Sequence, residues 1–164
     1  MALWICGALF PAAGPARADG PLPLEAFPRE TIVIETRSAR RHVFDAWRAD
    51  APETRAQGLM FVRSLKPDQA MIFVYARAER ASMWMKNTLI PLDMLFVDAE
   101  GCIVHLHERA TPGSLATIEA GGPVELVVEL AGGTARTLRI SVGDQVVRPD
   151  AGWPERPGRC ATGP

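Results

Sequence analysis

The stretch "SMWMKNTLIPLDMLFVD", residues 82–98, places four polar side chains inside a run that is otherwise apolar. Lys86, Asn87, Thr88 and Asp93 supply an ammonium, an amide, a hydroxyl and a carboxylate close together in the chain. Convergent polar groups above an apolar floor are typical of small-ligand sites. The same residue types have a structural interpretation, because Asn and Thr side chains next to a turn bond to nearby backbone groups.

The meeting of these groups depends on how two predicted strands pair. If residues 82–88 and 91–97 are antiparallel neighbours joined by a tight turn, Lys86 faces Asp93 across the ladder. Two fully buried charges would cost more than they contribute. We therefore expect the pair at a wet end of the sheet, with the Lys86 stem packed on Trp84. A slip of one residue would place the two charges on opposite faces.

Two further residues complete the predicted binding site. Arg55 lies in a predicted short helix, and Glu129 lies in a predicted strand. We expect Arg55 to pair with Glu53 or with Glu129, and Glu129 to lie near the sheet end, since a buried and unpaired carboxylate is costly. The predicted ligand is a small molecule or a cell-envelope partner.

Two alternative functions remain open from the sequence. Asp93 and Glu129 could form the carboxylate pair of a hydrolase-like enzyme. Thioethers and imidazoles could bind Cu(I), which soft ligands favour. The candidate Cu(I) ligands are Met60, Met71, Met83, Met85, Met94, His105 and His107. Filling of the core is the simpler role for the methionines, and an exposed strand face is the simpler place for the histidines.

Other catalytic patterns are missing from the chain. The sequence has no G-x-S-x-G frame around a serine, no phosphate loop and no Cys-x-x-Cys motif. We therefore assign no catalytic residue, no metal and no cofactor, and we expect a binding module more than an enzyme.

Periodicity predicts a single mostly β domain over residues 31–148. About eight strands are expected, among them 31–36, 41–50, 70–75, 82–88 and 123–130, and two more flank a Gly-containing turn in 91–109. Short helices are expected in 51–61, ending at Gly58, and in 131–140. The simplest architecture is an antiparallel β-sandwich or barrel of jelly-roll type with two short helices.

The ends of the chain differ in composition from this domain. Residues 1–18 combine a short apolar stretch with an "ARA" pattern, which predicts a cleaved export signal and a periplasmic or secreted protein. That stretch is too short to span a bilayer, so we expect no integral membrane span after cleavage. Residues 19–30 are a Pro-rich leader, and residues 149–164 are a Pro/Gly-rich tail.

The cysteine content and the net charge indicate which disulfide and which kinds of partner to expect. Signal cleavage would leave Cys102 and Cys160, which either form a disulfide in an oxidising compartment or remain two unpaired thiols. The net charge of −1 gives no reason to expect nucleic-acid binding. We expect a monomer.

Several motifs together resemble the "domain of unknown function 192" family of small, often exported proteins. The matching pieces are "TRAQGLMF" (54–61), "AMIFVY" (70–75), "MWMKNTLIPLDMLFVD" (83–98), "EGCIV" (100–104), "VELAGGTA" (128–135) and "VGDQV" (142–146). The resemblance implies a compact β-sandwich or barrel and no established reaction. It draws attention to Arg55, Gly58, Met60, Trp84, Met85, Lys86, Asn87, Thr88, Pro91, Asp93, Glu129, Gly132, Gly143 and Asp144.

Overall fold

A computed structural model describes residues 20–151 and Cys160. Within them the chain is mostly β, as the sequence predicted. The strands are β1 (Arg29–Glu35), β2 (Arg41–Ala49), β3 (Gln69–Glu79), β4 (Ser82–Met83), β5 (Leu92–Val97), β6 (Ile103–Ala110), β7 (Ile118–Glu119), β8 (Val124–Ala131) and β9 (Gln145–Val147). The helices are η1 (Leu24–Ala26), α1 (Pro52–Gln57), α2 (Thr134–Leu138) and η2 (Pro149–Ala151).

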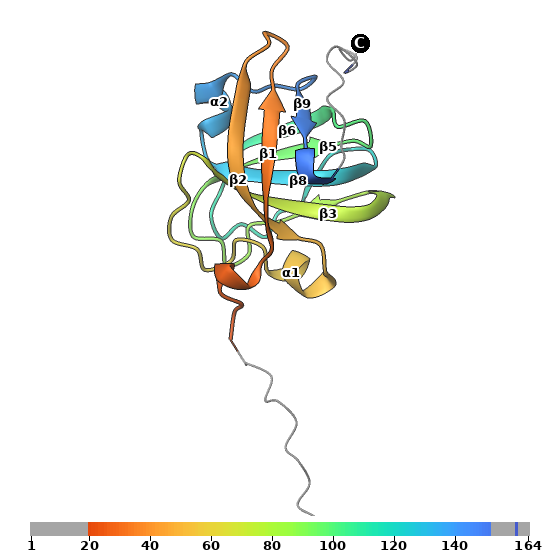
Figure 1. Cartoon of the computed structure of the whole chain (residues 1–164). Helices are drawn as coiled ribbons and strands as arrows, with labels where there is room; N and C mark the ends of the chain where they lie inside the picture. Colours follow the sequence, from red (N-terminus) through yellow and green to blue (C-terminus); the bar gives the residue numbers. More distant parts are fainter. Residues whose placement is uncertain (1–19, 152–159, 161–164) are drawn as a thin grey trace, which may run out of the picture.

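Seven of the strands form one curled sheet (Figure 1), in the order β6-β5-β8-β3-β2-β1-β9. The short strands β4 and β7 pair separately. The sheet is mixed, because β2 and β3 run parallel while its other pairs are antiparallel. A parallel pair needs a long crossover connection. The segment from 50 to 68, which contains α1, supplies it.

The central strands are apolar on both faces because the core has two parts. On β3, Met71 and Phe73 pack into the first apolar cluster, while Ala70 and Ile72 pack into the second. Successive side chains of a strand point to opposite faces, so the two clusters lie on opposite sides of the sheet. The position of β3 between β8 and β2 confirms the prediction of a central strand for 70–75.

The prediction of a strand over 82–88 is wrong beyond its first two residues. Only Ser82 and Met83 pair, and their partner is β7. From Trp84 onward the chain forms a loop, whose Met85 N–H donates to the carbonyl of Ser114 at 3.0 Å. The alternation of buried and exposed side chains continues through this loop without a strand ladder.

Both predicted short helices are present. The Thr54 hydroxyl accepts from the Ala51 N–H at 3.1 Å and donates to the Ala51 carbonyl at 2.9 Å, which holds the first turn of α1. Gly58 ends the helix as predicted, with φ of 51°. A Cβ at this position would lie 2.8 Å from the Phe73 ring, so the close approach requires glycine.

A disulfide joins Cys102 to Cys160, with their Cα atoms 5.3 Å apart. It ties Cys160 to the sheet next to the first residue of β6. The predicted export signal of residues 1–18 and the rest of the predicted tail after Ala151 lie outside the described residues. Within the described part of the chain, no helix has the length and apolar character needed to cross a membrane.

Candidate functional site

A cavity of about 410 Å³ lies between α1, the far end of β3 and the loop that follows β4. Its apolar walls include Leu59, Phe73 and Met83, and its polar lining comes from segments far apart in the sequence. Five of the seven predicted ligand-binding residues are involved: Trp84, Lys86, Thr88, Arg55 and Glu129 line it. Asn87 and Asp93 do not.

Glu129 is the buried acid of this cavity. On β8 it pairs with Met71 of β3 and with Met94 of β5, both fully buried. Only 3% of the residue is exposed, and its Oε2 has no hydrogen-bond partner among the described residues. Burial raises the pKa of Glu129 to about 8, because removal from water penalises the charged form. At neutral pH the carboxyl group is therefore mainly protonated.

Tyr75, at the same end of β3, is the only tyrosine in the chain. Its hydroxyl donates to Met83 Sδ at 4.0 Å. Burial and the nearby charge of Glu79 raise the pKa of Tyr75 to about 12, against the opposing effect of Arg55. The phenol therefore stays neutral, and its oxygen keeps lone pairs that can accept hydrogen bonds.

Arg55 of α1 is held by backbone carbonyls, and neither of the carboxylates suggested from the sequence pairs with it. Its guanidinium donates to Val74 O at 3.3 Å and to the carbonyl oxygen of Asp50, and it lies 5.5 Å from the centroid of the Tyr75 ring. These contacts fix the cation against the cavity wall.

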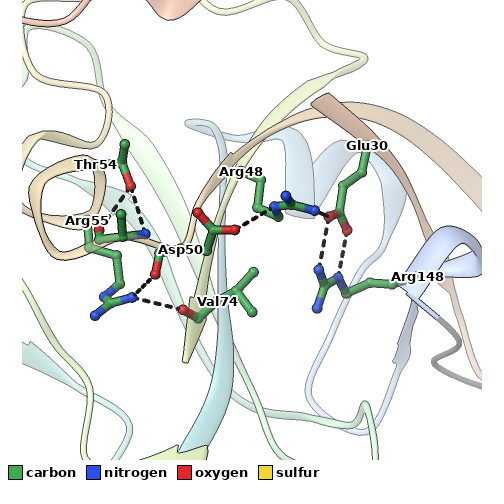
Figure 2. A network of polar contacts seen from close by, with 8 residues as sticks. Glu30, Arg48, Asp50, Thr54, Arg55, Val74 and Arg148 are labelled. Carbon is green, nitrogen blue, oxygen red and sulfur yellow. Dashed lines mark hydrogen bonds and ion pairs between the residues drawn. The ribbon is translucent and has the colours of Figure 1, made fainter. Parts of the chain in front are cut away.

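Figure 2 shows that the Arg55 contacts continue into an ion-pair network. The Asp50 carboxylate meets Arg48 at 2.9 Å, and Arg48 reaches Glu30 at 3.5 Å. Glu30 also receives two hydrogen bonds from Arg148, at 2.6 and 2.9 Å. Glu30 and Arg148 are both buried, and charge-assisted hydrogen bonds of this paired kind are among the strong ones.

Lys86 and Trp84 lie at the mouth of the cavity. The Lys86 ammonium is 5.3 Å from the centroid of the Trp84 ring, which agrees with the expected packing of the two side chains. Trp84 is 50% exposed. No carboxylate forms an ion pair with Lys86 in the described part of the chain, so its charge is available to a ligand.

The loop that carries Lys86 is hydrogen-bonded to the segment after α1, and both contain a residue with positive φ. Asn87 and Phe61 both have positive φ, 55° and 65°, and the Phe61 N–H donates to the Asn87 carbonyl at 2.9 Å. The Asn87 side chain contacts Met60 Sδ at 3.8 Å. Thr88 is buried and its hydroxyl donates to the Lys86 carbonyl at 3.3 Å. Asn adopts positive φ readily, whereas for Phe61 this conformation is unfavourable.

Asp93 lies elsewhere, and the predicted Lys86–Asp93 pair is wrong. β5 pairs with β6 and β8, not with residues 82–88. The Asp93 carboxylate is fully buried and accepts from three backbone N–H groups: Arg109 at 2.8 Å, Gly133 at 2.9 Å and Ala135 at 2.8 Å. It therefore holds the start of α2 against the sheet.

Asp93 and Glu129 do not form the carboxylate pair considered from the sequence. In the ladder Met94 lies opposite Glu129, and Asp93 lies opposite Leu130. Because paired residues share a face and successive residues alternate, the two carboxylates point to opposite sides of the sheet. The expected position of Glu129 at the sheet end is also corrected: it is buried in the sheet.

The candidate Cu(I) ligands are spread over different surroundings. Met71, Met85 and Met94 are fully buried in the first apolar cluster. Met94 pairs with Glu129 and His107, not with Met85. His105 packs against the Phe96 ring, with 5.5 Å between centroids. No group of three or more His, Cys, Asp or Glu residues in the described ranges could hold a metal ion.

Sequence reasoning missed Tyr75, Glu79 and Arg80, which line the cavity. Tyr75 carried the one usable signal, since it is a polar-tipped aromatic residue that ends the apolar run "AMIFVY". Glu79 and Arg80 follow the predicted strand 70–75, and only the folded chain brings them into one cavity with residues of α1.

Comparison with known proteins identifies a family. The family profile of DUF192, described as "Uncharacterized ACR", matches residues 33–148. No curated protein sequence matches the chain.

Two solved structures are similar to the chain along most of its length. One is a proposed transcription regulator from Sinorhizobium meliloti 1021, with 40% sequence identity and a TM-score of 0.73 over 74% of this chain and 95% of that protein. The other is a protein of unknown function from Novosphingobium aromaticivorans DSM 12444. It has 34% sequence identity and a TM-score of 0.72 over 85% of this chain and 99% of that protein.

Proposed function

The chain belongs to the DUF192 family, and we propose that it is a binding module that takes a small molecule in the cavity lined by Glu129, Tyr75 and Lys86. The observation that carries this proposal is the carboxyl group of Glu129, which lines the cavity and whose buried Oε2 has no hydrogen-bond partner among the described residues. An unsatisfied buried polar group costs about 1–3 kcal/mol. A ligand group that bonds to this carboxyl group would recover that cost.

The surroundings support a site with both apolar and polar recognition. Leu59, Phe73 and Met83 provide apolar walls, while Lys86 provides a charge at the mouth. The cavity volume falls in the range of about 300–1,000 Å³ that is usual for small-molecule sites. Hydrolysis by an Asp93–Glu129 pair is not proposed, because the two side chains lie on opposite faces of the sheet.

Export to an oxidising compartment is part of the proposal. The Cys102–Cys160 disulfide supports it, because such bonds persist mainly outside the cytoplasm. A periplasmic or secreted binding module would meet small molecules of the cell envelope and the medium.

Thermal-shift screening of the protein against envelope metabolites, sugars, amino acids and peptides tests the function. We expect at least one class to raise the melting temperature, and Lys86→Ala to reduce that shift. Lys66→Ala is the matched control, since Lys66 is the only other lysine and is exposed in the loop before β3. A screen in which no compound stabilises the protein, or in which both lysine variants behave alike, would contradict the assignment.

A further inference from the structure

We propose that the ligand is a small zwitterion, whose ammonium group binds Glu129 and whose anionic group meets the basic mouth of the cavity. This inference rests on the proposed function and names the chemical class that the same cavity would select. Amino acids and short peptides with an apolar side chain belong to this class.

The inner lining of the cavity is rich in hydrogen-bond acceptors. Tyr75 directs its hydroxyl proton to Met83 Sδ, and Thr88 directs its own to the Lys86 carbonyl. Each hydroxyl has only one proton, so while these two bonds are made both oxygens offer lone pairs to a ligand. Glu129 also lines the cavity, its Oε2 has no partner among the described residues, and its carboxyl group is a pure acceptor once it is ionised. A group that fits this lining must donate several hydrogen bonds, as an ammonium does with three.

The acid itself favours a cation. A buried carboxyl group is neutral when alone, and a nearby positive charge favours its ionised form. A bound ammonium would therefore convert Glu129 to a carboxylate and form charge-assisted hydrogen bonds, which are roughly twice as strong as neutral ones. A ligand with an anionic group at this position would instead meet a like charge or force Glu129 to stay protonated.

The mouth of the cavity favours an anion. Lys86 and Arg80 line it, and neither has a carboxylate ion pair within the described part of the chain. Arg55 adds a third cation, while the only other lining carboxylate is the exposed Glu79. A ligand that is only cationic would be repelled at this entrance. A ligand with opposite charges at its two ends can bind both Glu129 and the basic mouth of the cavity.

Matched ligands test this division directly. The probes are leucine and phenylalanine, together with their N-acetyl forms, which lack the ammonium, and their amides, which lack the carboxylate. Calorimetric titration of the intact, disulfide-bonded protein gives the dissociation constant of each probe. We expect the zwitterions to bind at least tenfold more tightly than either derivative.

Two variants test which end of the ligand binds to which residue of the cavity. Glu129→Gln should weaken zwitterion binding at least tenfold and bring it close to that of the N-acetyl form. Lys86→Ala should weaken binding of the zwitterion and leave that of the amide unchanged. Glu100→Gln and Lys66→Ala are controls with exposed side chains away from the cavity. Circular dichroism confirms that each variant is folded.

The outcomes separate the inference from the function on which it rests. If N-acetyl forms bind as tightly as the parent amino acids, or if only sugars or other uncharged molecules bind in a Lys86-dependent manner, the zwitterion inference is wrong and the binding function stands. If no probe and no compound of the wider screen binds, both fail.

Discussion

The carboxyl group of Glu129 lies between two fully buried methionines, where an apolar side chain would be more stable. Natural proteins keep such costly groups mainly where function needs them. Neither neighbouring strand offers Oε2 a partner in the described residues, whereas the buried carboxylates of Asp93 and Glu30 are hydrogen-bonded. We infer that the cost at Glu129 is offset by binding.

The pH dependence of stability should reveal this residue. The pKa of Glu129 is about 8 in the folded state, above its ordinary value of 4.5. The folded protein therefore keeps a proton that the unfolded chain releases as the pH rises through 4.5. Stability from this group is full below about 4.5, falls between 4.5 and 8, and levels off above 8, with a slope of at most about 1.4 kcal/mol per pH unit.

Urea unfolding at several pH values from 5 to 9 measures this slope. Glu129→Gln should remove the decline and should be more stable than the parent protein at pH 8, because its amide is never charged. Glu100→Gln should keep the parent slope. Equal slopes for the parent and Glu129→Gln would show that the carboxyl is already ionised in the folded protein.

At the scale of elements, Asp93 connects β5 to α2 and to the end of β6. Its carboxylate accepts from the backbone N–H groups of Arg109, Gly133 and Ala135. Helix α2 has only five residues, too few to be stable without tertiary contacts. The buried carboxylate therefore contributes to the position of this helix and not to the candidate ligand site.

Replacement of Asp93 should cost stability and spare binding. In Asp93→Asn the amide NH₂ would face a backbone N–H group that in the parent protein donates to a carboxylate oxygen, so this hydrogen bond would be lost. Hydrogen bonds to a charged group are worth about 1.5–3 kcal/mol each. We expect a loss of about 3 kcal/mol in the free energy of unfolding, with ligand affinity unchanged at temperatures where the variant is folded. Asp68→Asn, exposed before β3, should change little. A loss of affinity in folded Asp93→Asn would return Asp93 to the binding site.

At the scale of the whole molecule, the disulfide closes a long loop through the sheet. Cys102 lies beside Gln145 at the start of β9 and is buried, while Cys160 is 58 residues away along the chain. The loop includes β6, β7, β8, α2 and β9. The bond restricts the unfolded chain over this entire segment.

Removal of the disulfide should destabilise the protein without changing its site. For a loop of this length the chain-entropy relation gives about 4 kcal/mol. Cys160→Ser and the reduced parent protein should both lose about this amount in chemical denaturation, and neither should lose affinity for a ligand. If the parent protein, isolated without reductant, has Cys102 and Cys160 as free thiols by mass spectrometry, the bond does not form.

Local patterns in the sequence determined which segments become strands and helices. Alternation predicted β1 and β2, the apolar run 70–75 predicted the central strand β3, and Gly58 marked the end of α1, because these features depend on neighbouring residues. The same rule failed at 82–88. Alternation reports which side chains are buried, and in this loop Met83 and Met85 are buried while the backbone bonds to Ser114 and Gly113 instead of a strand.

The sequence by itself named Trp84, Lys86, Thr88, Arg55 and Glu129, but only the tertiary structure decided that they share a cavity and that Asp93 does not. Pairing partners depend on contacts between segments far apart in the chain. The Asp93 carboxylate, for example, is bound by Gly133 and Ala135, which are 40 and 42 residues away. The burial of Glu129 likewise follows from the alignment of β8 with β3 and β5. Residue type fixes what a side chain can do, whereas the long-range register of the strands fixes where it does it.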